Sequence, residues 1–305
     1  MNSKPLLPVK SDFIFKAIFG DQKNVSILAA FLKTIIDIPE HEYEQLVIID
    51  PHIKKETEHD KYGILDVKLH TKTKSVVHIE IQLQVFPDLR QRIIYGQSKL
   101  ITEQMSTGQD WSVIKRAITI LITDELFIRE SDDYYNRFRY RTNSAIELTD
   151  LMEINTLELC KLPPETDNTD LWDWTKFIKS DDEGALDMLA DKNTHIKEAV
   201  AVLKELSADE RARMLCEERE IMRRNIASMM SGAKAEGHAE GRAEGRAEGR
   251  AEARAESMLE TARKALSMNI DIEAIMTLTG LPREDIENIK QHSNDTPNVI
   301  KHCRS

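Results

Sequence analysis

The sequence predicts an α/β sheet domain followed by a helical C-terminal extension. Three observations support this class. Apolar stretches with strand patterns occur three times before residue 85, helical periodicity flanks them on both sides, and almost everything beyond residue 185 has a helical pattern. The order expected over the first 125 residues is therefore helix, helix, strand, strand, strand, helix, strand.

The first five elements follow from local signals. In chain order they are helices at residues 12–19 and 27–36 and strands at residues 46–49, 64–70 and 76–84. Ser11 is a typical N-cap, Gly20 ends the first helix, and Pro39 stops the apolar periodicity of the second. The second and third strands alternate apolar and polar residues, as a strand with two different faces does.

Helical periodicity returns after Pro87, and we expect this helix to bury Leu89, Ile93, Ile94 and Leu100 and to end by Gly108. The β-branched run at residues 117–122 is typical of a central strand. Residues 126–205 are less regular. Their aromatic stretch at residues 134–140 fits strands, and residues 171–180 fit a helix that folds back on the sheet.

Composition narrows the functional classes. The chain has 305 residues, of which 41% are hydrophobic and 31% charged, and its formal net charge is −11. The acidic excess lies beyond residue 120, so the nearly neutral first part remains compatible with a nucleic-acid partner. No apolar run has the length of a membrane span or a signal core, so we expect a cytoplasmic protein without membrane contact. Three scattered cysteines form neither a disulfide framework nor a metal motif.

A four-residue repeat, AEGR with variants, begins at Ala235. Residues four apart share a helix face, so like charges align, and each interior glycine costs about 1 kcal/mol relative to alanine. Two interpretations remain open, a solvated spacer and a self-associating arm. Two short amphipathic helices follow, at residues 258–268 and 272–289, separated by residues 269–271, and residues 279–282 form a turn inside the second. We therefore predict three parts: a domain at residues 1–205, a helical or flexible arm at 206–257, and a small helix-turn-helix-like tail at 258–292.

The hairpin formed by the second and third strands places two acids face to face. If its turn is centred on Thr73, Asp66 lies directly opposite Glu80 and Ile64 opposite Gln82. Opposed carboxylates repel each other unless a cation lies between them. One interpretation is a solvated face on which Lys68 and Lys74 neutralise the acids. The other is a divalent-metal site that polarises a phosphodiester and activates water.

Several segments together resemble the Rpn family of recombination-promoting nucleases and transposases, within the PD-(D/E)XK nuclease superfamily. They are Asp12-Phe13-Ile14-Phe15-Lys16, Lys61 with Asp66, Glu80-Ile81-Gln82, Arg92 with Tyr95, Ser98-Lys99-Leu100, Glu158-Leu159-Cys160-Lys161-Leu162, the Trp174 helix, the AEGR repeats and the Thr-Gly-Leu tail. The resemblance implies an αβββαβ core within residues 1–205, DNA as the substrate, and Mg²⁺, with Mn²⁺ as the alternative.

The resemblance also implies roles for single residues. Asp66 and Glu80 would hold the metal, with Gln82 orienting water or phosphate where the wider superfamily usually has a lysine. Lys61 or Lys16 would then supply the missing positive charge.

Two further assignments each have a structural alternative. Arg92 and Tyr95 lie one helical turn apart and would bind a phosphate, unless Arg92 is a surface partner of an acid and Tyr95 is a half-buried core ring. Asp12 is a possible additional site residue, unless it serves only the helix dipole. His78 and His70 share the polar face of the hairpin, where a histidine is more often solvent-facing than a metal ligand.

The function expected from these features is a Mg²⁺-dependent DNA endonuclease, a hydrolase that promotes recombination or derives from a transposase. It would form homo-oligomers through the helical arm. The alternative is a catalytically inactive DNA- or protein-binding module that uses the arm for self-association, and a structural coiled-coil scaffold is a third reading.

Overall fold

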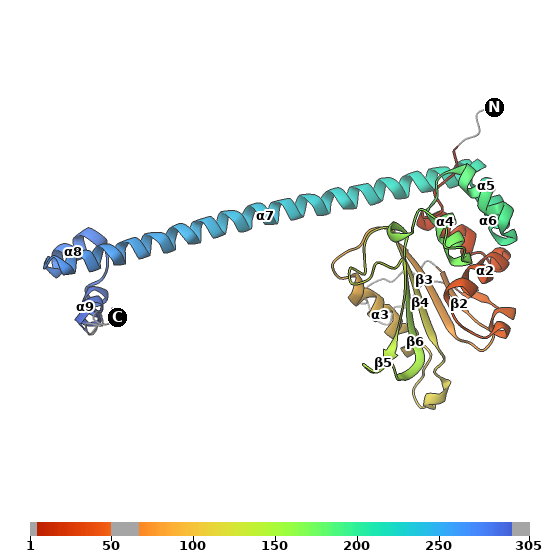
Figure 1. Cartoon of the computed structure of the whole chain (residues 1–305), viewed down its shortest axis with the longest axis horizontal. Helices are drawn as coiled ribbons and strands as arrows, with labels where there is room; N and C mark the ends of the chain where they lie inside the picture. The colour runs from red at the N-terminus through yellow and green to blue at the C-terminus, as the bar shows by residue number, and fades with distance from the viewer. Residues whose placement is uncertain (1–4, 50–66, 295–305) are drawn as a thin grey trace, which may run out of the picture. The chain divides into compact units, whose positions relative to one another are not determined.

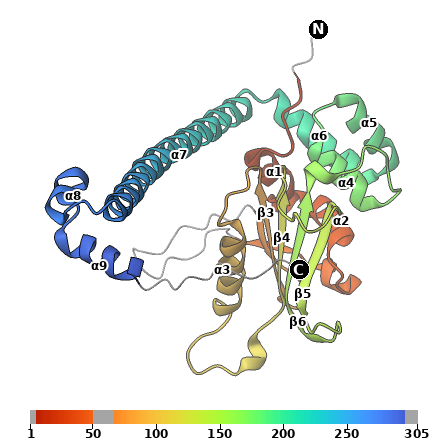
Figure 2. The same ribbon diagram turned by 60° about the vertical axis from the view of Figure 1, so that its left-hand side comes forward.

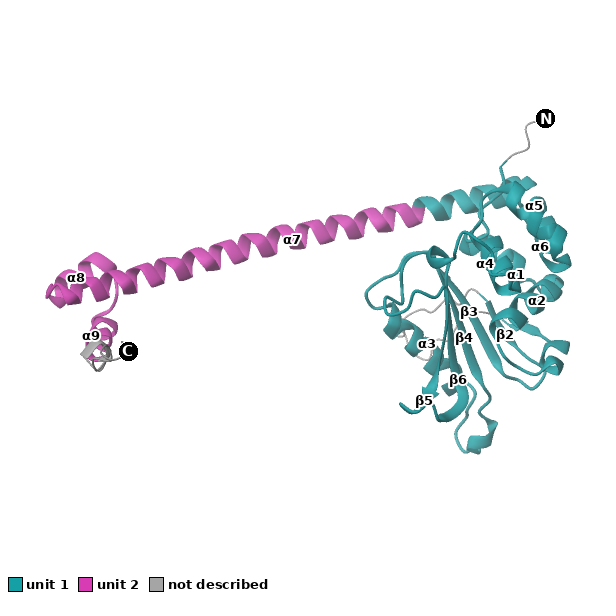
Figure 3. Ribbon diagram, viewed as in Figure 1, with its two compact units in different colours: residues 1–221 teal, residues 222–305 magenta. Residues whose placement is uncertain are grey.

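The computed structural model describes residues 5–49 and 67–294. The chain forms two compact units, residues 1–221 and residues 222–305 (Figure 3). The long helix α7 (Glu210–Ser267) begins in the first unit and ends in the second. The predicted division at residues 205 and 257 remains a prediction.

The first unit contains a six-stranded sheet and the helices that cover it (Figure 1). Its longer elements are, in chain order, α1 (Asp12–Phe19), α2 (Val25–Ile35), β1 (Val47–Ile49), β2 (Val67–His70), β3 (Val76–Gln82), α3 (Leu89–Thr102), β4 (Ala117–Thr123), β5 (Tyr135–Arg141), β6 (Glu147–Glu158), α4 (Asp170–Lys179), α5 (Glu183–Lys192) and α6 (Thr194–Ala208). Single-turn 3₁₀ helices connect several of them, at Gln22–Asn24, Glu40–Glu44, Trp111–Val113 and Leu159–Lys161. This order confirms the predicted α/β class.

The strands have the spatial order β1-β2-β3-β4-β6-β5. β1, β2 and β3 are antiparallel neighbours, β3, β4 and β6 run parallel, and β5 closes the edge antiparallel to β6. The crossover from β3 to β4 passes through α3, because a parallel connection cannot be made by a hairpin. Val67 pairs with Ile79 and Lys68 with His78, so the described part of the β2–β3 hairpin has the predicted register.

One face of the sheet is covered by α1, α2, α4 and α6, whose apolar sides form the main core with the inward residues of β2, β3 and β4. An aromatic cluster lies at its centre: the ring centroids of Phe19 and Trp174 are 5.9 Å apart, and those of Phe31 and Trp174 are 5.8 Å apart. Helix α4 contributes two buried side chains to this core, Trp172 and Trp174. It is the helix that the sequence predicts to fold back on the sheet. This layer fixes α1 against β3.

The other face is covered by α3, on the side of the sheet away from α2 and α4 (Figure 2). Leu89, Ile93 and Leu100 are buried as predicted, but Ile94 is exposed and Gln97 takes a buried position instead. The side-chain amide of Gln97 donates to the backbone oxygens of Ala117 and Glu153, at 3.1 and 2.9 Å. A polar side chain is therefore buried because two carbonyl groups accept its hydrogens.

The second unit is helical. Beyond α7 it contains α8 (Ile272–Thr279) and α9 (Arg283–Asn294), and Gly280 between them adopts a left-handed conformation with φ of 71°. Ala262, Ala265, Ile275 and Ile286 form a small core that joins these helices. The AEGR repeats lie inside α7, so they are helical here. Within the described ranges no helix combines the length and apolar character needed to cross a membrane.

The aromatic cluster generates a test of the core. Trp174 is 1% exposed, whereas Trp111 on a surface turn is 77% exposed. We expect Trp174→Ala to reduce the free energy of unfolding by about 3–5 kcal/mol, because it removes a large buried ring and leaves a cavity. The matched change Trp111→Ala should cost less than about 0.5 kcal/mol. Urea unfolding followed by circular dichroism measures both values, and similar losses would contradict the core described here.

Candidate active site

Glu80 and Gln82 stand on the α3 side of β3, near its carboxyl end. β3 runs parallel to β4, with Glu80 opposite Leu121 and Gln82 opposite Thr123. Alternate residues of a strand share a face, so both side chains emerge beneath α3. The carboxyl ends of parallel strands are where α/β sheets commonly bind ligands. The predicted pair is thus held on a fixed strand at a suitable edge.

The carboxylate of Glu80 is paired with Arg92 of α3. An Nη2 hydrogen of Arg92 is donated to Oε1 of Glu80 across 2.9 Å, and the side chains are 46% and 15% exposed respectively. Burial raises the pKa of Glu80, and the positive charge of Arg92 opposes that rise. Arg92 therefore bonds an acid, as one of the two sequence interpretations proposed, and its contact with substrate stays a prediction.

Two of the predicted site residues, Asp66 and Lys61, lie outside the described residues. The described ladder reaches Val67, which pairs with Ile79. The opposition of Asp66 and Glu80 therefore stays a prediction. It would extend by one residue pair the register that the structure shows from Val67 and Ile79 onward. Lys68 is nearly buried and bonds Glu103 at 2.8 Å. The interpretation of this hairpin face as solvated is wrong at Lys68, whose described partner is Glu103 and not Glu80; its pairing with Asp66 lies outside the described residues.

Lys16 and Asp12 come from α1, in the layer on the opposite side of the sheet from α3. Lys16 is exposed. Asp12 bonds Arg219, whose guanidinium lies 5.7 Å from the ring centroid of Phe13. No described contact brings either residue to Glu80. The structure thus gives Asp12 a partner on α7, and its place in the site stays a prediction.

Tyr95 lies one turn beyond Arg92 on α3 and is exposed. The ammonium of Lys99 is 6.0 Å from the centroid of its ring. The exposed fraction of Tyr95, 48%, agrees with a half-buried ring, but Tyr95 belongs to none of the apolar clusters of the described residues, so its interpretation as part of the core is wrong. Its surface position beside Arg92 leaves the predicted phosphate contact available.

Oxygen donors are present for a divalent ion, though the described residues do not complete a site. Glu80 supplies a carboxylate and Gln82 an amide oxygen, and Mg²⁺ prefers oxygen ligands. Only Oε1 of Glu80 receives the bond from Arg92. Within the described ranges no three histidine, cysteine, aspartate or glutamate side chains cluster closely enough to hold a metal. The chemistry of these donors fits such an ion, and the prediction assigns the second carboxylate to Asp66, which lies outside the described residues.

Sequence reasoning missed the buried ion pair that anchors the loop after β4. Lys161 donates to Oε1 of Glu158 at 2.8 Å and to the backbone oxygen of Ser131 at 2.7 Å. Oε2 of Glu158 accepts the backbone N–H of Phe127 at 2.8 Å. In the sequence, Glu158 and Lys161 belong only to a short motif. The acid and base three positions apart are its only local signal, and the loop that they hold is far away in the sequence.

The same loop supports the turn that follows β3. Oε2 of Glu125 accepts the backbone N–H of Val85 at 2.9 Å. This bond ties the loop to the segment between Gln82 and α3. The position of Gln82 therefore depends partly on residues 40 and more positions later in the chain.

A buried polar patch lies next to Glu80 on the same face of the sheet. His78 is 2% exposed, and neither of its ring nitrogens has a hydrogen-bond partner among the described residues. The neighbouring hydroxyl of Thr119 is equally unpaired in that part of the chain. Burial, with a smaller contribution from Lys68, lowers the pKa of His78 to about 3. The expectation that this histidine faces solvent is wrong, and the imidazole is neutral at neutral pH.

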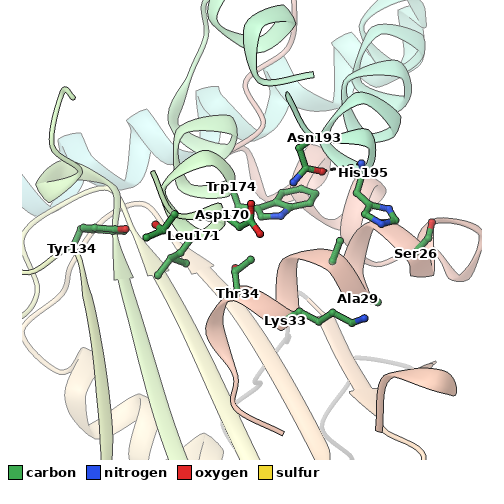
Figure 4. A pocket seen from close by; sticks show the side chains of 12 residues that line it. Ser26, Ala29, Lys33, Thr34, Tyr134, Asp170, Leu171, Trp174, Asn193 and His195 are labelled. Carbon is green, nitrogen blue, oxygen red and sulfur yellow. Dashed lines mark hydrogen bonds between the residues drawn. The ribbon is translucent and has the colours of Figure 1, made fainter. Parts of the chain in front are cut away.

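A surface pocket of about 630 Å³ lies between α2, α4 and the start of α6 (Figure 4). Lys33, Tyr134, Trp174 and His195 are among its lining residues. None of the predicted site residues lines it. These helices cover the face of the sheet opposite α3, so this pocket is separate from Glu80.

A mixed six-stranded sheet with helices on both faces and a partly buried acid on β3 fits the class of PD-(D/E)XK nucleases. The chain matches the family model described as PD-(D/E)XK nuclease family transposase over residues 9–233, and it belongs to that family. Searches of curated proteins and of solved structures found no match. Enzymes of this family are generally hydrolases that act on DNA and typically use a divalent metal.

The Glu158–Lys161 pair can be tested by a double-mutant cycle. We expect Lys161→Met to reduce the free energy of unfolding by about 3–5 kcal/mol, because it leaves a buried carboxylate without its counter-charge. The double variant Glu158→Gln with Lys161→Met should recover a large part of that loss. Urea unfolding of the wild type, the two single variants Glu158→Gln and Lys161→Met, and the double variant measures the coupling free energy between the two side chains. Additive effects would show that the two charges do not support each other.

Proposed function

We propose that this protein is a metal-dependent DNA endonuclease of the Rpn type that hydrolyses phosphodiester bonds in recombination or transposition. The family membership over residues 9–233 supports the class. The observation that carries the proposal is the partly buried carboxylate of Glu80, which lies two residues before Gln82 near the carboxyl end of β3. A carboxylate held beneath a helix is costly, and a bound cation offsets that cost.

Asp66 and Glu80 would hold Mg²⁺ or Mn²⁺ in this proposal. Such an ion polarises a phosphodiester oxygen and acidifies a bound water. Glu80 contributes a carboxylate that β3 and α3 hold in place, so little motion is needed to form the site. The amide of Gln82, on the same face and one residue pair nearer the strand end, would orient the water or the phosphate.

Gln82 is a departure from the lysine that the superfamily usually has at this place. An amide offers a dipole, whereas an ammonium offers a full charge that stabilises negative charge in the transition state. We propose Lys61 or Lys16 as the substitute. Lys16 is exposed on α1 and would need to approach from the other layer.

Arg92 and Tyr95 would contact the DNA backbone. Both project from the same side of α3 at helical spacing, and Tyr95 is exposed. A guanidinium binds phosphate through two N–H groups, and an aromatic ring stacks on bases or sugars. The helix-turn-helix-like tail formed by α8 and α9 would help to direct the enzyme to its target.

One observation favours the inactive alternative. Gln82 removes the usual positive charge, and the exposed arm gives the protein a binding surface that needs no catalysis. A binding module would retain DNA affinity without cutting. Cleavage by the purified protein distinguishes the two.

We expect the purified full chain to nick supercoiled plasmid DNA in the presence of Mg²⁺. Glu80→Gln and Asp66→Ala should each lower the nicking rate by about 100-fold or more, because each removes a charge that stabilises the transition state. Glu130→Gln serves as the matched control, since Glu130 is an exposed acid paired with Arg90 at 2.9 Å. Gel electrophoresis of the plasmid forms measures all four rates. Equal nicking by wild type and both site variants would exclude this active site.

Metal removal gives a second readout that does not require cleavage. Binding to the native state raises the melting temperature, so Mg²⁺ should stabilise the wild type and chelation should abolish the increment. Glu80→Gln should lose that increment.

We further propose that the protein forms homo-oligomers through α7. Residues 228–257 are all exposed within the chain. Three exposed apolar side chains, Met222, Ile226 and Met229, follow the alternating four- and three-residue spacing of a coiled-coil seam. A second copy of the same helix would cover this seam.

The glycines of the repeat support the same conclusion. α7 contains four of them in its repeat, at positions 237, 241, 245 and 249, and each weakens an isolated helix by about 1 kcal/mol. A methyl group added at any of the four would meet no atom within 4 Å. Packing within the chain therefore does not explain them, whereas close approach of another helix would use their small size.

The seam is tested by sedimentation. We expect the triple variant Met222→Ser, Ile226→Ser, Met229→Ser to shift the full chain toward monomer, because it removes the apolar contact area between copies. Met188→Ser on α5, which also removes an exposed methionine, should leave the assembly unchanged. Sedimentation velocity over a range of protein concentrations measures the shift. Identical distributions for wild type and triple variant would contradict the proposed interface.

A further inference from the structure

The ion pair between Arg92 and Glu80 links two residues that the proposed function uses separately. Glu80 is the proposed metal ligand, and Arg92 is the proposed phosphate contact. In the structure they bind each other, with Nη2 of Arg92 2.9 Å from Oε1 of Glu80. The bond joins β3 to the N-terminal part of α3, across the face on which the site would form.

The pair has one fixed and one movable partner. Glu80 is 15% exposed and rises from the middle of a sheet, so its carboxylate has little freedom. Arg92 is 46% exposed, and its long side chain can carry the guanidinium into solvent without repacking the core. If the pair opens, it is therefore Arg92 that moves.

Neighbouring basic groups do not replace Arg92 on this carboxylate. Lys68, on the adjacent strand of the same face, bonds Glu103 at 2.8 Å. Arg90, two residues before Arg92 on α3, bonds Glu130 at 2.9 Å. Within the described ranges, the charge that balances Glu80 thus comes from Arg92.

We propose that Arg92 is a resident counter-ion of Glu80 that a divalent cation displaces, and that the released guanidinium then binds the DNA phosphate. The inference rests on the proposed function. A guanidinium and a divalent ion at one carboxylate repel each other, and in a partly desolvated place this repulsion is strong. Metal and Arg92 therefore compete for Glu80, while metal and DNA cooperate through Arg92.

This arrangement predicts effects of opposite sign, which a purely structural role of Arg92 would not produce. Removing Arg92 takes away the competitor, so Mg²⁺ should bind more tightly. The same change removes a phosphate contact, so DNA should bind more weakly. Loss of fold would weaken both.

The experiment is calorimetric titration of the full chain with Mg²⁺ alone, for wild type, Arg92→Ala, Arg92→Lys and Arg90→Ala. We expect Arg92→Ala to bind Mg²⁺ about three- to tenfold more tightly, a change of up to about 1.4 kcal/mol. Arg92→Lys keeps the charge and should stay near wild type. Arg90→Ala removes the same charge two residues away and should change the affinity less than about twofold, because its partner is exposed.

One additional measurement completes the test. Binding of a short DNA duplex, followed by fluorescence anisotropy in Ca²⁺ to prevent cleavage, should be weaker for Arg92→Ala than for Arg90→Ala.

The outcomes distinguish this inference from the proposed function. If the wild type binds Mg²⁺, and a folded Arg92→Ala protein binds it with equal or weaker affinity than the wild type, the counter-ion role is overturned and the metal site is retained. No Mg²⁺ binding by wild type or Arg92→Ala would overturn the metal site itself, and this inference with it. Circular dichroism spectra and melting curves establish that each variant is folded.

Discussion

The partial burial of one carboxylate between a sheet and a helix is the constraint on which the site depends. α3 must cover the second face of the sheet, because β3 and β4 are buried on both sides and would otherwise expose apolar residues to water. The same helix removes most of the water from Glu80. A carboxylate in such a place needs a positive partner, and the helix that creates the need also supplies Arg92.

Local signals were sufficient for much of the fold. Strand alternation and the position of the turn predict the β2–β3 register, since both act over a few residues. Which helix covers each face of the sheet depends on tertiary packing and has no local signal in the sequence. For this reason strand alternation predicts a solvent-facing His78, whereas the structure buries it on the face that α3 covers. The exchange of Ile94 for Gln97 on α3 has the same origin: Gln97 is buried because two carbonyls from other strands accept its hydrogens.

The candidate site shows the same division between local and distant information. Periodicity placed Glu80 and Gln82 on one face, because a strand repeats every two residues. It could not choose between a phosphate and an acid as the partner of Arg92, since helical spacing identifies neighbours on the helix and not across the sheet. The support of the turn after β3 by Glu125 was equally hidden, because the bond to Val85 joins residues 40 positions apart.

The position of Gln82 and the pairing of Arg92 belong to one electrostatic argument. A lysine at position 82 would bring a permanent positive charge beside Glu80, and Arg92 would then be a second cation at the same carboxylate. With a neutral amide at 82, a single guanidinium from α3 balances the acid. That guanidinium is half exposed and bonded to the carboxylate, so its charge reaches a phosphate only after the pair opens. Catalysis without the strand lysine would therefore depend on the order of events, with metal first and then contact of Arg92 with DNA.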